Sequence, residues 1–375
     1  MLRNKDKGIT LIALVITIII LLILAGISIS ALTNQGLFKN AKIAQNATEK
    51  AEIEQGQKLN EYEDEINKYL NNANEDEKIG LITDNINKEL SKTDNTKLKD
   101  EKGNRIVVPA GFKIVDGATT VDKGIVIEDV TETATKGSQF VWVPVGTITK
   151  ADGTTTTITL GRYDFDSTTG KESAYSGTYV EEDSNDSSTL KKWGNTIAKN
   201  ITNFKNSVAA NGGYYIGRYE AKTATARNAA ENALTQITEK GTENVYNYVT
   251  QLQAAQLSQN MYNSDKFTSD LMNSYAWDTT TVFIQNCGTN SKYSRQNSLN
   301  TSLAQKGITT DIQCNIYDMA GNVYEWTTET SLNSSNHCGA RGGSYIDSSK
   351  YTSFRNSIGT SGSGIHVGFR PLLYL

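Results

Sequence analysis

The stretch Tyr317-Asp318-Met319-Ala320-Gly321-Asn322-Val323-Tyr324-Glu325-Trp326 is the most informative block in this chain of 375 residues. Two blocks precede it, Phe140–Pro144 and Gly213–Glu220, and two follow it, Arg341–Tyr345 and Gly368–Arg370. Short β-branched and aromatic runs bounded by glycine and proline are typical of strands. We therefore predict an α+β domain over residues 105–375.

The blocks, in this order, resemble the formylglycine-generating-enzyme family, also called sulfatase-modifying factors. The resemblance spans about residues 106–375 and implies an irregular C-type-lectin-like fold whose last strand ends at the C-terminus. The sequence pattern itself predicts a hairpin and long loop over 146–188. It also predicts helices around Val245–Leu257 and Ser264–Met272.

The residues that carry catalysis in this family are replaced here. In catalytic members, two cysteines follow the Gly-Gly-Ser block and bind copper, but the corresponding residues are Asp347 and Thr352. Copper(I) selects soft sulfur ligands. Relatives that use iron carry histidine ligands, whereas His337 and His366 are the only histidines and lack a ligand spacing. We expect no copper, no iron and no enzymatic activity.

The same resemblance implies a calcium site on the 317–326 block. The residues that match the family's calcium ligands are Asp318, Gly321, Val323 and Glu325. Two carboxylates and two carbonyls suit a cation that prefers six to eight oxygen ligands. A second interpretation stays open, in which Asp318 caps the turn and Glu325 is buried against Arg341 or Arg370.

A polar and aromatic segment follows Gly343 and is a candidate ligand-binding face. Tyrosine and serine together supply rigid contact area and adaptable hydrogen bonds. The composition is similar to the variable surface of lectin-fold proteins that are diversified by reverse-transcriptase cassettes. The predicted ligand-binding residues are Tyr345, Asp347, Ser348, Ser349, Tyr351, Ser353 and Asn356. The alternative is a polar surface loop on a structural subunit.

The N-terminus has the features of an anchor. Basic residues precede Gly8, and no charged residue occurs from Ile9 to Phe38. Residues 9–35 are long and apolar enough for a transmembrane helix, with the N-terminus in the cytoplasm. The leader at residues 1–8 resembles that of type IV prepilins and pseudopilins. This implies cleavage between Gly8 and Ile9 by a prepilin peptidase, methylation of the new terminus, and other pilin-like subunits as partners.

The pilin family usually has a glutamate five residues into the mature chain, and Ala13 stands there instead. This departure puts ordinary pilus assembly in doubt. A secretory signal peptide cut after Ala25, or a buried core helix, are the competing interpretations of the apolar run. Residues 36–104 are predicted to form a helical stalk followed by a polar linker. The helical part is equally consistent with a helix that lies on the domain.

The net charge of -4 shows no basic footprint, so we expect no nucleic-acid partner. Cys287, Cys314 and Cys338 fit no zinc spacing. They leave two alternatives open: a disulfide between Cys314 and Cys338, or three reduced thiols.

These observations predict a protein of the bacterial cell membrane that displays a non-catalytic, lectin-like adhesion domain outside the cell. Its expected ligand is an extracellular protein or glycan. A structural pseudopilin of a filament or secretion apparatus is the alternative, and a diverged oxidase is the third interpretation.

Overall fold

The computed structural model describes residues 11–34, 48, 80–81, 86–88, 90–115, 117–181, 200–235, 237–238, 243–304, 310–332 and 335–375. The chain divides into two compact units, Met1–Asp76 and Glu77–Leu375. The predicted leader with Gly8 and Ile9 lies outside the described residues, as does most of the predicted stalk.

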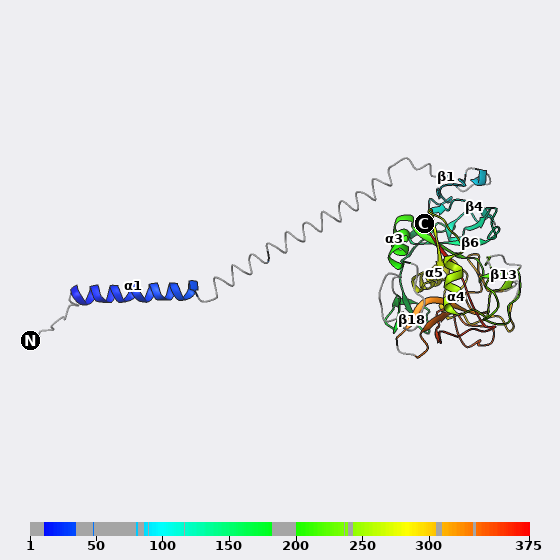
Figure 1. The fold of residues 1–375 in the computed structure, drawn as a ribbon. Helices are drawn as coiled ribbons and strands as arrows, with labels where there is room; N and C mark the ends of the chain where they lie inside the picture. Colours follow the sequence, from blue (N-terminus) through cyan, green and yellow to red (C-terminus); the bar gives the residue numbers. More distant parts are fainter. Residues whose placement is uncertain are drawn as a thin grey trace, which may run out of the picture. The chain divides into compact units, whose positions relative to one another are not determined.

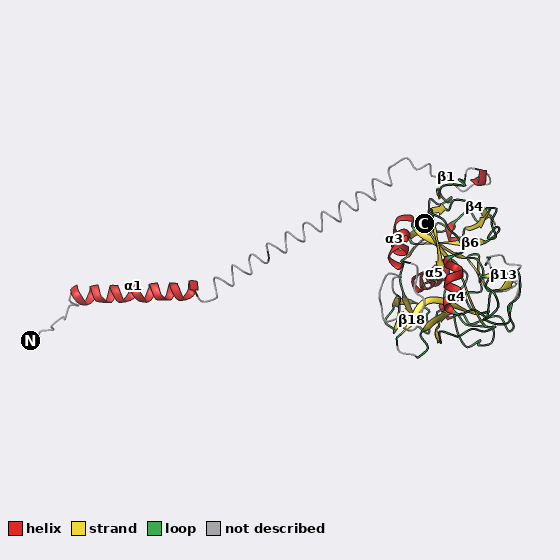
Figure 2. Ribbon diagram, in the orientation of Figure 1, coloured by secondary structure: helices red, strands yellow, loops and turns green. Residues whose placement is uncertain are grey.

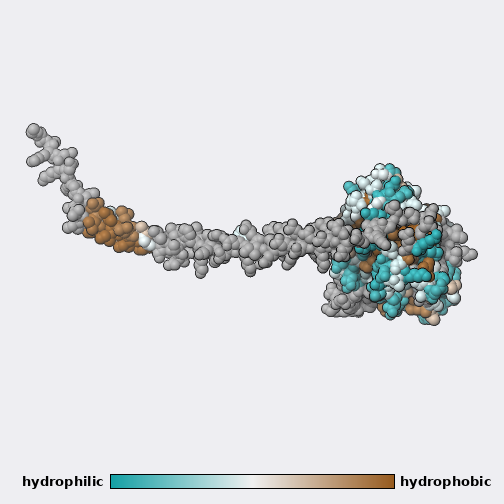
Figure 3. Space-filling view, turned by 90° about the horizontal axis from the view of Figure 1, so that it is seen from above, coloured by the Kyte–Doolittle hydropathy of each residue, from teal (hydrophilic) through white to brown (hydrophobic). Residues whose placement is uncertain are grey.

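The first unit contains helix α1 (Leu11–Asn34), within the range 9–35 where the sequence predicts a membrane-spanning helix. Its described side chains, at positions 14–27, are mostly apolar and exposed, and Figure 3 shows them as the brown segment. Among the described residues, no helix is both long and apolar enough to cross a membrane. The predicted membrane span is therefore not supported by the structure.

The second unit is built on a six-stranded antiparallel sheet (Figures 1 and 2). In spatial order its strands are β15 (Thr268–Leu271), β22 (Pro371–Tyr374), β12 (Gly213–Gly217), β6 (Gln139–Pro144), β5 (Val126–Asp129) and β4 (Phe112–Val115). Every residue of β12 is buried, and Tyr215 stacks on Trp142 of β6 with ring centroids 4.9 Å apart. The strand predicted at Phe140–Pro144 is confirmed, and of the stretch predicted at Gly213–Glu220 residues 213–217 form the strand that pairs with it.

A second sheet of five strands carries the C-terminal blocks. It contains β11 (Tyr179–Val180), β18 (Tyr324–Ser331), β19 (Cys338–Arg341) and β20 (Arg355–Ile358) in that order, and β21 (Val367–Phe369) pairs with β18 in parallel. All eight residues of β18 are buried, although most are polar. Its polar side chains must therefore find partners inside the domain.

Three helices pack on these sheets: α3 (Ile201–Asn211), α4 (Gln251–Gln259) and α5 (Ser274–Cys287). Thr250 and Gln253 form a capping box that fixes the start of α4, inside the predicted helical window. The helix predicted at Ser264–Met272 is wrong, because residues 268–271 form β15 instead. Pairing with the buried β22 satisfies their backbone groups and overrides the helical pattern.

Shorter elements complete the unit. A three-stranded sheet joins β1 (Gly80–Leu81), β2 (Thr96–Lys99) and β3 (Arg105–Val108), so the predicted domain boundary at residue 105 falls inside a sheet. Leu98 of β2 is buried in the core.

The other strands form two-stranded antiparallel pairs. These are β7 (Gly146–Thr149) with β8 (Thr155–Ile158), β9 (Tyr163–Phe165) with β10 (Glu172–Ala174), β13 (Lys222–Thr223) with β14 (Asn244–Val245), and β16 (Ile312–Gln313) with β17 (Ile316–Tyr317). The single-turn 3-10 helices are η1 (Ile86–Lys88), η2 (Val121–Lys123) and η4 (Tyr293–Arg295).

Candidate functional site

The 317–326 block forms a tight turn that enters β18. Asp318, Gly321 and Asn322 all have positive φ angles, of 58°, 115° and 57°, and these residue types adopt the left-handed region most readily. The buried carboxylate of Glu220 holds the turn, since it accepts hydrogen bonds from the Asn322 side chain and from the Val323 backbone N–H, the latter at 3.0 Å. Burial, together with the nearby charge of Asp318, raises the pKa of Glu220 well above its usual value.

Glu325 follows this turn and is neutralised by Arg370. Its two carboxylate oxygens accept from the Arg370 guanidinium at 2.7 and 3.0 Å. Arg370 also donates to the carbonyls of Gly217 and Tyr317, so it joins both sheets to the turn. The sequence-based alternative in which Glu325 is buried against Arg370 is therefore confirmed.

The predicted calcium ligands lie on this one turn and the start of β18, but oxygens of both carboxylates, Asp318 and Glu325, already accept hydrogen bonds from protein groups. Arg370 binds both oxygens of Glu325, and Asn300 donates to Asp318 at 3.1 Å. In the described part of the chain, no three His, Cys, Asp or Glu side chains are grouped to hold a metal ion. This arrangement fits neutralisation by arginine better than calcium binding, and calcium stays a prediction.

The candidate ligand-binding segment leaves β19 at Gly342 and returns as β20. Asp347 is fixed in it, because its carboxylate accepts from Tyr324 at 2.9 Å and from Ser349 at 2.8 Å. Burial opposes ionisation, but these hydrogen bonds outweigh it and lower the pKa of Asp347. Ser348 and Ser349 are exposed, and Tyr345 is half-buried with its backbone N–H bonded to Asn322.

Two of the predicted ligand residues have structural partners. Ser353 is buried and its hydroxyl donates to the carbonyl of Ser294 at 2.9 Å. Asn356 lies within β20 and pairs with Ala340 of β19. Tyr351, by contrast, is half-exposed, and the Arg295 guanidinium lies 3.5 Å from the centroid of its ring.

Tyr351 lies at a cavity of about 360 Å³, a volume within the range of small-molecule sites. Its lining comes from the β9–β10 region, from η4 and from the candidate segment, and consists of Asp164, Phe165, Tyr175, Gly177, Thr178, Tyr179, Arg295, Tyr351, Ser353, Phe354 and Arg355. Sequence reasoning missed Tyr175, Tyr179 and Arg295. The recurrence of tyrosine in the 163–179 stretch, which we interpreted as a loop insertion, was a signal for Tyr175 and Tyr179, whereas Arg295 had no signal in the sequence.

A buried network of charges supports one wall of this cavity. Arg355 and Arg341 each contact both Asp278 and Glu329, with 2.9 and 3.0 Å to Glu329. Arg162 adds a third guanidinium, 2.9 Å from Glu329. Burial works to raise the pKa of Glu329, but the three arginines outweigh it and hold the pKa at about 2.

This network also fixes an aromatic wall of the cavity. The guanidinium groups of Arg355 and Arg162 lie 4.0 and 4.5 Å from the ring centroid of Tyr175. Since both arginines are held by buried carboxylates, the Tyr175 ring is held in place before any ligand arrives.

The residues at the family's cysteine positions serve structural roles. Thr352 is fully buried, its backbone carbonyl accepts from the Trp277 indole at 3.0 Å, and its N–H donates to Gln296. The three cysteines are free, so the Cys314–Cys338 disulfide is not formed. Burial raises the pKa of Cys287 and Cys338 to about 12, which keeps both thiols protonated and unreactive at neutral pH.

Two sheets, several separate two-stranded pairs and long irregular connections define a β-rich mixed domain of the sulfatase-modifying-factor type. The chain belongs to the family of the sulfatase-modifying factor enzyme 1-like domain, whose model matches residues 143–373. The resemblance predicted for the C-terminal domain is thus confirmed, whereas the N-terminal leader lies outside the match.

Two solved structures are similar to this chain at low identity. Variable protein 1 of Treponema denticola is 13% identical, and the similarity covers 65% of this chain and 98% of that protein with a TM-score of 0.37. The protein CarF is 15% identical over 35% of this chain and 67% of its own length, with a TM-score of 0.26. No curated protein matches the chain.

Proposed function

We propose that this protein is a non-catalytic member of its family that binds an extracellular protein or glycan at the bacterial surface. The ligand site is the cavity between Tyr175, Arg295 and Tyr351, with the exposed segment around Asp347 beside it. The observation that carries the proposal is the combination of five aromatic rings with an arginine in one cavity. Aromatic and arginine side chains dominate the binding energy of protein interfaces.

Arg295 is the polar residue best suited to contact a ligand. It makes no ion pair with any described residue, and its guanidinium is stacked on Tyr351. Arg355, by contrast, already binds two carboxylates. A ligand carboxylate or hydroxyl at Arg295 then costs little reorganisation, because stacking has already ordered the arginine.

The proposal that the protein is not an enzyme rests on the residues at the two positions where catalytic family members have cysteines. Asp347 and Thr352 replace the thiols that would bind copper, and Thr352 is fully buried in its own hydrogen bonds. Nothing at these two positions supplies a soft ligand or a nucleophile in thiolate form.

Attachment to the membrane is the second part of the proposal and rests on the sequence. The uncharged run from Ile9 to Phe38 contains helix α1 and follows basic residues. An uncharged apolar run that follows basic residues is the sequence pattern of an anchor that leaves the following residues outside the cytoplasm. Cleavage between Gly8 and Ile9 would leave this helix intact.

Two measurements test these parts separately. Mass spectrometry of the mature N-terminus should find a methylated chain that begins at Ile9, and a chain that begins after Ala25 would disprove the prepilin leader.

For binding, full-length protein in detergent is applied to arrays of glycans and peptides. The triple variant Tyr345→Ala, Asp347→Ala, Tyr351→Ala should fold but lose the signal, and unchanged binding would exclude this face.

The alternative of a structural pseudopilin differs in the location of the protein. A filament subunit appears in material sheared from the cell surface, whereas a tethered binding protein stays with the membrane fraction. Recovery of most of the chain in the sheared fraction would favour the pseudopilin.

A further inference from the structure

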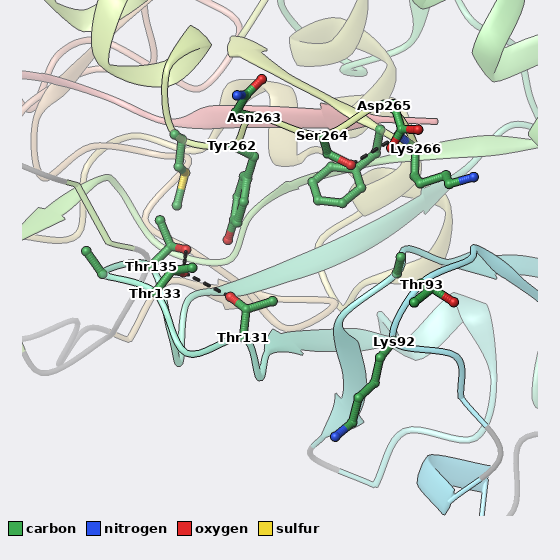
Figure 4. Close-up of a pocket in the computed structure, with 14 residues that line it drawn as sticks. Lys92, Thr93, Thr131, Thr133, Thr135, Tyr262, Asn263, Ser264, Asp265 and Lys266 are labelled. Atoms are coloured by element: carbon green, nitrogen blue, oxygen red, sulfur yellow. Dashed lines mark hydrogen bonds between the residues drawn. The ribbon is translucent and has the colours of Figure 1, made fainter.

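A second cavity, of about 470 Å³, lies elsewhere in the 77–375 unit and shares no lining residue with the first. Three segments form it: the turn after β5 with Thr131, Thr133 and Thr135, the 261–267 connection between α4 and β15, and Lys92 with Thr93. Figure 4 shows the three threonines together on one side and the residues from Tyr262 to Lys266 along another.

One wall of this cavity is a supported aromatic ring. Tyr262 is half-exposed and packs on Phe267, Phe112 and Phe140, with ring centroids 5.4, 5.7 and 6.2 Å apart. Its hydroxyl donates to the buried carboxylate of Asp129 at 3.2 Å. The ring is therefore fixed at both ends, and a ligand that stacks on it does not need to order it first.

Another wall of the cavity is a chain of three threonine hydroxyl groups, which have fewer hydrogens than their hydrogen-bond contacts require. Asp129 accepts from the hydroxyls of Thr131 and Thr135 at 2.5 and 2.6 Å. The Thr133 hydroxyl lies 2.9 Å from that of Thr131 and 2.8 Å from that of Thr135. Thr131 and Thr135 donate to the carboxylate, so Thr133 must be the donor in both contacts. One hydroxyl has one hydrogen, and one of the two contacts is left without a donor.

The missing hydrogen determines which kind of ligand group can bind to the three threonine hydroxyls. The threonine oxygens keep free lone pairs, so they accept from a ligand that donates hydrogen bonds. Thr133 is exposed, which leaves its oxygen open to such a ligand.

The charges around the cavity balance each other. Lys266 pairs with Asp94 at 3.3 Å, and Lys92 and Asp265 contribute one further charge of each sign. The carboxylate of Asp129 behind the threonine wall is buried and already accepts hydrogen bonds from Thr131, Thr135 and Tyr262. The exposed charges therefore favour neither an anionic nor a cationic ligand.

We propose that this cavity is a second ligand site, which binds a neutral carbohydrate. A sugar ring presents an apolar C–H face that suits Tyr262 and hydroxyl groups that donate to the oxygens of the threonine wall. The volume of the cavity is within the roughly 300–1,000 Å³ that small-molecule sites occupy. Nothing in this proposal depends on the ligand face at Tyr351.

The test uses full-length protein in detergent and saturation-transfer NMR with three classes of probe. The neutral probes are lactose, maltose and cellobiose, the anionic probe is glucuronic acid and the cationic probe is glucosamine. At least one neutral disaccharide should bind, more tightly than either charged sugar. Absence of binding by all three neutral sugars, or a preference for a charged one, would overturn the proposal.

Variants locate the binding. Thr133→Ala removes an exposed hydroxyl and should weaken binding of the neutral sugar at least tenfold without loss of stability. Tyr262→Phe keeps the ring and removes the hydroxyl that donates to Asp129, so it should have a smaller effect. The matched control is Thr157→Ala, since this exposed threonine bonds only to Thr147 in a hairpin away from the cavity. Equal affinity of Thr133→Ala and Thr157→Ala would exclude this cavity as the site.

Two further variants separate this proposal from the proposed function. Arg295→Ala and Tyr351→Ala should leave sugar binding unchanged, because neither residue lines this cavity. Loss of sugar binding in these variants would assign the sugar to the other site and refute the second one.

Discussion

The guanidinium of Arg295 lies 3.5 Å from the ring centroid of Tyr351, although 55 residues separate them in the sequence. The pairing of Asn297 with Tyr351 and the hydrogen bonds of residues 352 and 353 to residues 296 and 294 align the two segments. The stacked pair is therefore held by backbone contacts, and either side chain can be changed without loss of the fold.

The stacked pair gives the first prediction. Arg295→Ala should reduce affinity for any ligand found at the Tyr351 face by tenfold or more, because it removes the cavity-lining arginine that forms no ion pair with a described carboxylate. The free energy of unfolding should fall by no more than about 1 kcal/mol, since exposed cation–π contacts contribute little. The measurements are calorimetric titration and urea denaturation.

Lys292→Ala is the matched control for Arg295→Ala. Lys292 is exposed, precedes η4 and does not line the cavity. If both variants bind equally well, Arg295 has no part in recognition.

The buried network gives the second prediction. Glu329→Gln leaves Arg341 and Arg355 with Asp278 and removes the carboxylate that pairs with Arg162. We expect a loss of about 3–5 kcal/mol in the free energy of unfolding, because a buried charge without a partner is strongly unfavourable. Urea denaturation followed by tryptophan fluorescence measures it, since Trp277 and Trp326 are buried.

An exposed glutamate provides the reference for this experiment. Glu132 forms an exposed pair with Lys136, and Glu132→Gln should change stability by less than about 0.5 kcal/mol. Similar losses in the two variants would mean that the network contributes nothing beyond a surface ion pair.

The third prediction concerns acid stability. The pKa of Glu329 is about 2 in the folded protein, against an ordinary value of 4.5. Its contribution is therefore complete above pH 4.5 and is lost as the pH falls from 4.5 toward 2, with a size of roughly 3 kcal/mol. Urea midpoints at pH 5 and pH 3 should fall more steeply for the natural protein than for Glu329→Gln. Parallel curves would contradict the assignment.

The fourth prediction distinguishes calcium from arginine at Glu325. Because Arg370 binds both oxygens of Glu325, chelation of calcium should leave the melting temperature unchanged. A rise of several degrees on addition of roughly 1 mM calcium would instead show a bound cation. Loss of that rise in Glu325→Gln would then locate the ion at this turn.

The sequence was sufficient to predict the parts of the fold that have a local signal. The β-branched and aromatic runs at 140–144 and 213–217 form the predicted strands, since their side chains are buried whichever elements surround them. Thr268–Leu271 carried no such signal. It is a strand because β22 lies beside it, and that partner is a hundred residues away.

The candidate site was predicted only in part for the same reason. Tyr351 and Asp347 were selected because they follow the Gly-Gly-Ser block closely, and of the two only Tyr351 lines the cavity. Tyr175 and Arg295 lie beside Tyr351 only through contacts between segments that are distant in the sequence. Ser353 was predicted to face a ligand, but its hydroxyl donates to the carbonyl of Ser294 instead. In an irregular loop, successive side chains do not alternate between two faces, so the sequence does not show which of them point outward.

The position of β22 has a consequence for how the protein matures. Residues 371–374 fill the place between β12 and β15, so the central sheet cannot close before these residues have been synthesised. If the chain is exported as it is made, the domain crosses the membrane unfolded, and a polypeptide that stops before Pro371 lacks an interior strand of this sheet.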